Sequence, residues 1–184
     1  MPHPNEYFAA HISVAAEMDL HESGGLVVTG EEPSKEDSGT LLEAGSAVMA
    51  EAIVYLRNLA LENAKPMPAI IKQKLTPFFD PLVLEEVRYT TERSPLVGAA
   101  LRELIDTDKY ALAVTLDNVI VFSDEESLEN LWLWAHELKH VEQYARWGVK
   151  GFARNYLLDH QAVEQEANDY ARKVMQQLVT LTKR

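Results

Sequence analysis

The residues with the clearest chemical potential form one short string, His136-Glu137-Leu138-Lys139-His140. On a helix, residues four positions apart point to the same side, so both imidazoles can reach one metal ion. The Glu between them lies close enough to deprotonate a metal-bound water. Imidazole nitrogen and carboxylate oxygen suit zinc, and an open fourth position makes a zinc-bound water acidic. The string therefore predicts a zinc site in which Glu137 is the general base.

The segment around this string is expected to be a buried helix. Ser123 and the acidic residues 124–126 are typical of a helix start, and the helix is expected to run to about Trp147. Apolar residues occupy nearly every side of it: Leu128, Leu131, Trp132, Leu133, Trp134, Ala135, Leu138 and Val141. The alternative is a surface pair of histidines that matches the pattern by accident. Buried His and Glu side chains need partners, so the surroundings favour the metal site.

A site of this kind needs a third ligand, and the final helix, expected from about Leu157, offers Glu164 and Glu166. At about 100° per residue, Glu164 lies roughly 60° from Ala167, the centre of the apolar stripe, and Glu166 lies about 100° away on the other flank. Glu164 faces inward more and is predicted to be the third ligand. Its alternative role is a solvated charge on an amphipathic helix.

Several side chains are candidate donors to the oxyanion of a tetrahedral intermediate. His160 lies one turn before Glu164 on the inward side and is predicted to act in catalysis, although a capping or core histidine is an equal alternative. Tyr144, Tyr156 and Tyr170 are other candidates, and the sequence does not choose among them.

Six further elements are expected to surround this site. The first is a helix from an N-cap at Thr40 to about Asn63, and the second is a short helix over 69–79 broken by Pro77. A run over 81–89 then leads into a strand. A helix from Ser94-Pro95 to 106–108 and two strands within 110–122 follow. The two strands flank Asp117-Asn118, both of which tolerate the positive φ of a tight hairpin turn.

Composition limits the partners and the chemistry. Acidic side chains outnumber basic ones by 29 to 17, and the formal net charge of −12 repels phosphate backbones and anionic membranes. Nucleic acid and membrane are therefore not expected as partners. The absence of cysteine excludes disulfides, thiol catalysis and cysteine-based metal sites.

The N-terminal region differs from the rest of the chain. Residues 1–40 are polar, acidic and glycine-containing, and they are expected to form a mobile leader or linker before a domain over 41–184. No basic cluster precedes an apolar run, and no apolar stretch approaches the roughly 20 residues of a spanning helix. The chain is expected to be soluble, and either cytoplasmic or exported without a cleavable signal peptide.

Two stretches together carry a resemblance to a known family. Ala113-Val-Thr-Leu-Asp-Asn-Val-Ile-Val-Phe122 has the form of a hairpin T-x-G-x-x-I-x-F, and Leu133-Trp-Ala-His-Glu-Leu-Lys-His-Val-Glu-Gln143 has the form of a helix with H-E-L-x-H-V-x-Q. With the spacer between them they resemble the core domain found beside extracellular contractile injection systems, a family of bacterial metallopeptidases. The resemblance covers about residues 75 to 172, and it implies a peptidase activity and a secretion-system partner.

The last helix adds a second resemblance. Glu164-Gln-Glu-Ala-Asn168 is similar to the E-x-x-A-D ending of gluzincin peptidases, in which the first Glu is the third zinc ligand. The metzincin pattern is excluded because Arg146 occupies the position of its third histidine.

The chain departs from these patterns at two positions. In the hairpin pattern, Asp117 replaces the usual turn Gly. In the gluzincin pattern, Asn168 replaces the Asp that orients a zinc-bound histidine. An Asn carbonyl accepts a hydrogen bond but raises ligand basicity less than a carboxylate does.

These observations predict an α+β, mostly helical, zincin-like metallopeptidase domain with a small antiparallel β-hairpin beside the helix that carries the two histidines. Zn²⁺ is expected on His136, His140 and Glu164, and the expected substrate is a peptide or protein. The alternative is a weakly active or inactive zincin-fold adaptor that binds a protein partner in a secretion or injection system. In the peptidase, the 111–122 hairpin edge is expected to bind an extended peptide by strand addition.

Overall fold

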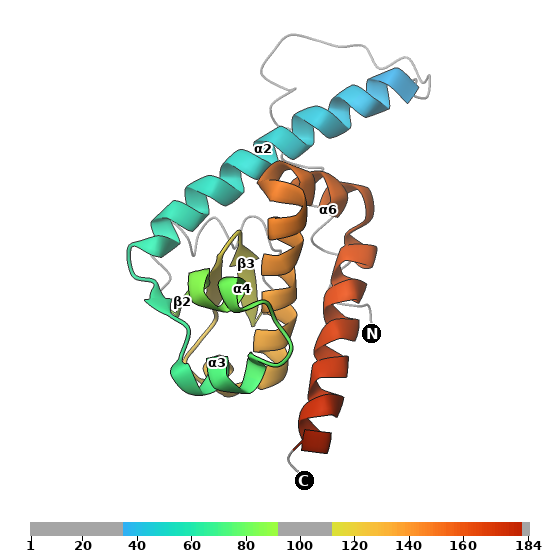
Figure 1. The fold of residues 1–184 in the computed structure, drawn as a ribbon. Helices are drawn as coiled ribbons and strands as arrows, with labels where there is room; N and C mark the ends of the chain where they lie inside the picture. The colour runs from blue at the N-terminus through green and yellow to red at the C-terminus, as the bar shows by residue number, and fades with distance from the viewer. Residues whose placement is uncertain (1–34, 92–111, 182–184) are drawn as a thin grey trace.

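Five helical elements and four short strands follow one another along the part of the chain that the computed structural model describes, residues 35–91 and 112–181. In chain order they are α2 (Lys35–Leu61), β1 (Lys65–Pro66), α3 (Ala69–Leu75), α4 (Pro81–Glu86), β2 (Arg88–Thr90), β3 (Ala113–Leu116), β4 (Val119–Phe122), the 3-10 helix η1 (Glu126–Glu129) and α6 (Leu131–Leu181) (Figure 1). The expected leader, up to residue 34, and the helix expected from Ser94 lie outside the described residues. The described part is α+β and mostly helical, as predicted.

The sheet is larger than the predicted hairpin and is mixed. Its strand order is β1-β2-β4-β3, in which β2 runs parallel to β4 and the other neighbours are antiparallel. The hairpin β3-β4 is confirmed, with Asp117 in a positive-φ conformation (φ 57°), but Asn118 does not share that conformation. The run expected to lead into a strand divides into α4 and β2, because Asp80 caps a helix that has Pro81 in its first turn.

The register of the hairpin determines which groups face outward on β3, the outer strand. Leu116 pairs with Val119 next to a two-residue turn, and Val114 pairs with Val121. Ser123 N–H donates to the Leu112 carbonyl at 2.8 Å, so Leu112 and Ser123 also form a hydrogen-bonded pair. Hydrogen-bonded and non-hydrogen-bonded pairs alternate in an antiparallel ladder. The N–H and C=O groups of Ala113 and Thr115 therefore point away from β4.

Helix α6 consists of three segments, because Gly148 (φ 69°, ψ 167°) and Asp159 (φ −156°, ψ 76°) leave the helical conformation. The break at Gly148 agrees with the predicted end near Trp147, and the Asp159 carboxylate caps the last segment by accepting from Ala162 N–H at 2.9 Å. The predicted helix start near Ser123 is wrong. Asn130 caps the first segment instead, since its side chain accepts from Leu133 N–H, while residues 126–129 form the separate η1 turn.

Helix α2 begins at Lys35 rather than at Thr40, and its C-terminal half packs on the domain. Ile53, Leu56 and Ala60 are buried, the last two against β3 and β4. Residues Gly39–Leu61 of α2 have a length and a composition that would allow a helix to cross a membrane. The sequence alone did not predict such a segment, because charged residues interrupt its apolar positions. Packing against the sheet accounts for the apolar residues on the buried side of α2.

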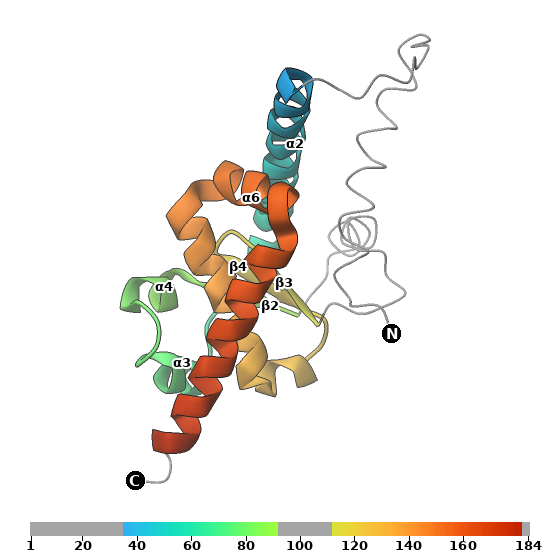
Figure 2. The same ribbon diagram turned by 90° about the vertical axis from the view of Figure 1, so that its right-hand side faces the viewer.

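The main core lies between the sheet, α3, α4 and the first and last segments of α6. Its largest fully buried side chains include Trp134, Phe122, Leu75, Leu84, Ile120 and Leu138. Trp134 and Phe122 place their ring centroids 4.6 Å apart, which joins α6 to β4. The first segment of α6 is thereby held against the sheet, and the last segment runs beside the first segment in Figure 1 and in front of it in Figure 2. This packing determines where the two halves of the candidate site meet.

Candidate metal centre

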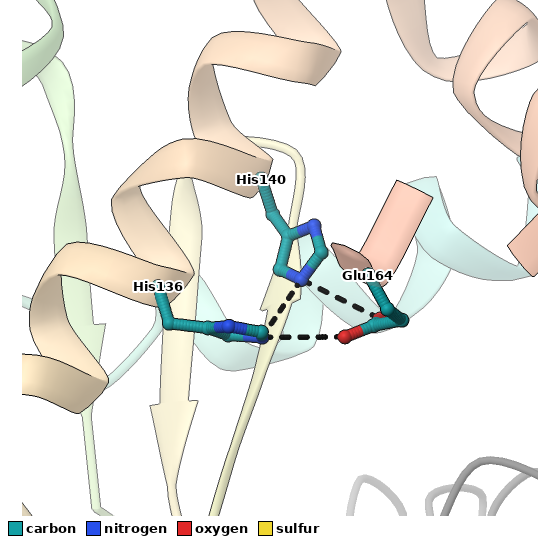
Figure 3. A group of neighbouring side chains, drawn as sticks. All are labelled: His136, His140 and Glu164. Carbon is teal, nitrogen blue, oxygen red and sulfur yellow. Dashed lines mark hydrogen bonds and ion pairs between the residues drawn. The ribbon is translucent and has the colours of Figure 1, made fainter. Parts of the chain in front are cut away.

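The structure brings His136, His140 and Glu164 together, as the sequence analysis predicted. The two histidines come from the first segment of α6 and the glutamate comes from the last segment (Figure 3). The two imidazole Nε2 atoms are 3.1 Å apart. The Glu164 oxygens lie 3.3 Å from Nε2 of His136 and 3.5 Å from Nε2 of His140. The two chain breaks between these segments allow the last segment to present Glu164 to the histidines.

This donor set fits a metal ion. Ligand atoms bound tetrahedrally to zinc lie about 3.3 Å from one another, and the three separations in the site are close to that spacing. Two imidazole nitrogens and a carboxylate face a common point with little access to water. Converging lone pairs repel unless a proton or a metal ion lies between them. The group can therefore hold a cation of the class that His and Glu ligands prefer.

Charge in the site follows from this convergence. Burial by itself lowers the pKa of His140, but the Glu164 carboxylate more than offsets it and raises that pKa to about 9. Burial raises the pKa of Glu164, yet the two histidines hold it well below its usual range. Without metal, a proton shared with the imidazoles balances the glutamate. A metal ion must displace that proton when it binds.

Glu137, the predicted general base, is buried next to the ligands. Its carboxylate Oε2 accepts a hydrogen bond from the Thr115 hydroxyl at 2.6 Å, and the same hydroxyl lies 3.2 Å from the Glu137 main-chain carbonyl. Thr115 belongs to β3, so this bond joins the sheet edge to the helix. The sequence analysis did not single out Thr115, although it is the Thr that begins the hairpin pattern T-x-G-x-x-I-x-F.

The ring nitrogen of His140 that points away from Glu164 also has a hydrogen-bond partner. Its Nδ1 lies 2.8 Å from Oε1 of Gln143, a fully buried residue that the sequence analysis named only as part of the helix motif. Glu166, the rejected alternative to Glu164, does not join the ligands. Its carboxylate accepts from Gln143 and from Arg146. Partial burial opposes ionisation of Glu166, but these hydrogen bonds and that of Lys139 lower its pKa to about 2.

The candidate oxyanion donors lie in different places. The Tyr156 hydroxyl donates to Glu164 Oε1 at 3.3 Å, and burial together with this carboxylate raises the pKa of Tyr156 well above its usual range. Tyr144 donates to the Thr115 carbonyl, and Tyr170 donates to the Phe78 carbonyl. His160 Nε2 is buried and has no hydrogen-bond partner among the described residues.

Aromatic rings hold the two histidines. Trp132 stacks on His136 with ring centroids 5.2 Å apart, and Phe152 meets His140 edge-on at 6.0 Å. The Nδ1 atom of His136 is buried without a hydrogen-bond partner within residues 35–91 and 112–181. Asn168 has no side-chain hydrogen bond in the same part of the chain. The described residues thus provide an orienting acceptor for His140 and none for His136.

Comparison with known families agrees with the hairpin and the helix. Residues 66–148 match the family model of the eCIS core domain. The matched segment extends from β1 to the break at Gly148. The match includes Thr115, Glu137 and both histidines, but Glu164 lies beyond it. No curated protein and no solved structure matches the chain. Over residues 66–148, this chain is therefore similar to the eCIS core domain, which is associated with extracellular contractile injection systems.

Proposed function

We propose that the protein is a zinc-dependent metallopeptidase with a zincin-like active site. The observation that carries the proposal is the meeting of His136, His140 and Glu164 around one point, with Glu137 on the same helix turn. The residue types suit zinc, and the string H-E-x-x-H on a helix is the arrangement that peptidases of this class use. The injection-system association of the family supports a protein substrate or partner in that setting.

Zinc, when bound by these three side chains, supplies a Lewis acid that polarises the scissile carbonyl and makes a water more acidic. Glu137 takes a proton from the attacking water while the water oxygen forms a bond to the carbonyl carbon. Glu137 then gives that proton to the amide nitrogen while the C–N bond breaks. Thr115 supports this role because its hydroxyl holds one carboxylate oxygen of Glu137 and leaves the other oxygen for the water.

The outer strand β3 is proposed to bind the substrate in an extended conformation. Ala113 offers an outward N–H and an outward C=O, and Thr115 offers an outward N–H. The outward carbonyl of Thr115 already accepts from the Tyr144 hydroxyl at 3.3 Å. A paired substrate therefore has hydrogen bonds available at Ala113 and at the Thr115 amide.

His160 is proposed as a donor to the oxyanion. Its buried Nε2, which lacks a hydrogen-bond partner among the described residues, supports this role. Tyr156 is the alternative donor because its hydroxyl already reaches the Glu164 carboxylate.

A second candidate function is that of a zincin-fold adaptor with little or no activity. It is favoured by Asn168, which stands at the position of an orienting Asp and makes no hydrogen bond to His136 in the described residues. Loss of this support weakens metal binding in sites of this kind. The injection-system association of the family suits an adaptor as well as an enzyme.

The metal site is tested by the zinc content of tag-free protein, measured by elemental analysis. We expect about one zinc per chain in the wild type, since the site offers three ligands around one point. Glu164→Ala removes a ligand and should lose most of the zinc. Asp169→Ala is the matched control because it removes an exposed carboxylate from the same helix segment. Absence of zinc from wild type purified in zinc-containing buffer would contradict the proposal.

Activity is tested by Glu137→Gln, which has nearly the same shape and can still accept from Thr115. Loss of the base should lower peptide turnover by about 10²- to 10⁴-fold, with zinc content and thermal unfolding unchanged. Products formed from a mixture of unstructured peptides are detected by mass spectrometry. The adaptor would be favoured if the zinc-loaded wild type cleaves no peptide and if Glu137→Gln binds its partner as well as the wild type does.

A further inference from the structure

Gln143 lies one turn beyond His140 and is fully buried. All of its amide hydrogen-bonding groups have partners. Its Oε1 faces Nδ1 of His140 at 2.8 Å, and its Nε2 donates to the Val163 carbonyl at 3.1 Å and to Glu166 Oε2 at 2.9 Å. Because both hydrogens of the amide are used in this way, the oxygen must be the atom that faces His140. The Nδ1 atom of His140 then carries a proton, which leaves Nε2 as the atom that can bind a metal ion.

An amide is the side chain that satisfies all three partners. His140 requires an acceptor, whereas Glu166 and the Val163 carbonyl require donors. A carboxylate at position 143 would accept from His140 but would face the Glu166 carboxylate and a carbonyl oxygen with no hydrogen to give. An alanine would leave both the His140 N–H and the Glu166 oxygen without this partner, and buried polar groups without partners are costly.

The partners of Gln143 join the two halves of the site. Gln143 and His140 belong to the first segment of α6, whereas Val163 and Glu166 flank the ligand Glu164 on the last segment. Two cations of the first segment hold Glu166 in place. Arg146 lies 2.8 Å from Glu166 Oε1, and the buried Lys139 lies 3.2 Å from the same oxygen. The backbone on either side of Glu164 is thus tied to the helix turn that carries His140.

We propose that Gln143 is the positioning residue of the metal centre: it selects the metal-binding tautomer of His140 and, through Glu166 and Val163, sets the distance between His140 and Glu164. This inference rests on the proposed metal site. The gluzincin pattern gives an orienting role to residue 168, but the Asn168 side chain makes no hydrogen bond in the described residues, and Gln143 orients His140 instead. Residues that orient a ligand in this way contribute about 10- to 100-fold to metal affinity.

The test compares the zinc affinity of full-length variants by competition with a chromophoric chelator. Gln143→Ala should bind zinc about 10- to 100-fold more weakly than the wild type. Gln143→Glu should also bind more weakly, because its carboxylate faces Glu166. The paired swap, Gln143→Glu with Glu166→Gln, restores one acceptor and one donor and should bind more tightly than Gln143→Glu alone. Gln161→Ala is the control because it deletes an exposed amide on the last segment.

Two further measurements separate a positioning role from a general contribution to folding. Thermal unfolding of the metal-free variants shows whether each is folded. The visible spectrum of the cobalt(II)-loaded protein reports the coordination geometry, and we expect it to change in Gln143→Ala and to return toward that of the wild type in the swap. If Gln143→Ala does not fold, the comparison of the swap with Gln143→Glu gives the answer.

The outcomes distinguish this inference from the metal site on which it rests. A wild type that binds no zinc overturns the proposed site itself. A wild type that binds zinc, with folded Gln143→Ala matching it in affinity and in cobalt spectrum, overturns the role of Gln143 alone. A swap that binds no better than Gln143→Glu also overturns it, because the donor-acceptor argument then fails.

Discussion

A carboxylate held between two imidazoles is the chemical centre of this protein. Glu164 raises the pKa of His140 to about 9 in spite of burial, and the histidines hold the pKa of Glu164 well below its usual range. At neutral pH without metal, the group therefore keeps a proton that an isolated buried histidine would lose. The same attraction for a positive charge would allow the group to hold a metal ion.

Apparent zinc affinity should rise with pH. Below about pH 9 a metal ion must displace the proton of His140, so affinity should increase by up to about tenfold per pH unit between pH 6 and 8. Competition with a chelator whose own pH dependence is known measures the trend. Calorimetry in buffers of different ionisation enthalpy counts the protons released. Equal affinity at pH 6 and pH 8, after correction for the chelator, would show that His140 is already neutral.

At the scale of elements, two interruptions of α6 bring the ligands together. In an unbroken helix, Glu164 would lie about 36 Å along the axis from His140, at 1.5 Å per residue. Gly148 adopts a positive φ, and Asp159 breaks the helix a second time and caps the segment that follows. The last segment consequently runs beside the first, and the Gln143-Glu166 bond holds them together.

The outer strand β3 is the element expected to receive substrate, and Ala113→Pro tests this. Proline removes the outward N–H of Ala113 but is tolerated at the first residue of an outer strand. The loss of one hydrogen bond, about 1 kcal/mol, should lower kcat/KM for peptides about fivefold. Zinc content should stay at the wild-type level.

Ala113→Ser is the control for this variant because it retains the N–H group. Peptide turnover by Ala113→Pro equal to that of Ala113→Ser would count against strand addition at this edge. Loss of zinc in Ala113→Pro would indicate instead that the hairpin had moved away from Glu137.

At the scale of the whole molecule, every group of the candidate centre lies between Ala113 and the last segment of α6. A chain that begins at Lys35, the first residue of α2, should therefore retain the zinc content of the full-length protein. Peptide turnover by the two chains tests whether the N-terminal residues inhibit the site. We expect equal turnover, and faster turnover by the shorter chain would identify residues 1–34 as an inhibitory segment.

Helices and strands were predicted correctly where neighbouring residues in the sequence determine them. The hairpin was predictable because Asp117-Asn118 lies between two apolar runs, and the break near Trp147 was predictable because Gly148 tolerates a positive φ. The start of α6 was wrong by seven residues, because Ser123 and Asn130 are both good caps and Asn130 is the residue that caps α6, while the Trp134 side chain donates to the Leu128 carbonyl in the separate η1 turn. Strand β1 is two residues long, too short to leave a periodic pattern, whereas β2 lies at the end of the run that was expected to lead into a strand.

The sequence by itself determined the three candidate ligands and the candidate base, because the two histidines and Glu137 lie within one helix turn and Glu164 occupies the inward flank of its helix. Only the tertiary structure decided what surrounds them. The hydrogen bonds of Thr115 to Glu137 and of Gln143 to Glu166 span 22 and 23 residues along the chain. Such contacts depend on how the sheet and the two segments of α6 pack, and helical periodicity carries no information about partners on another element.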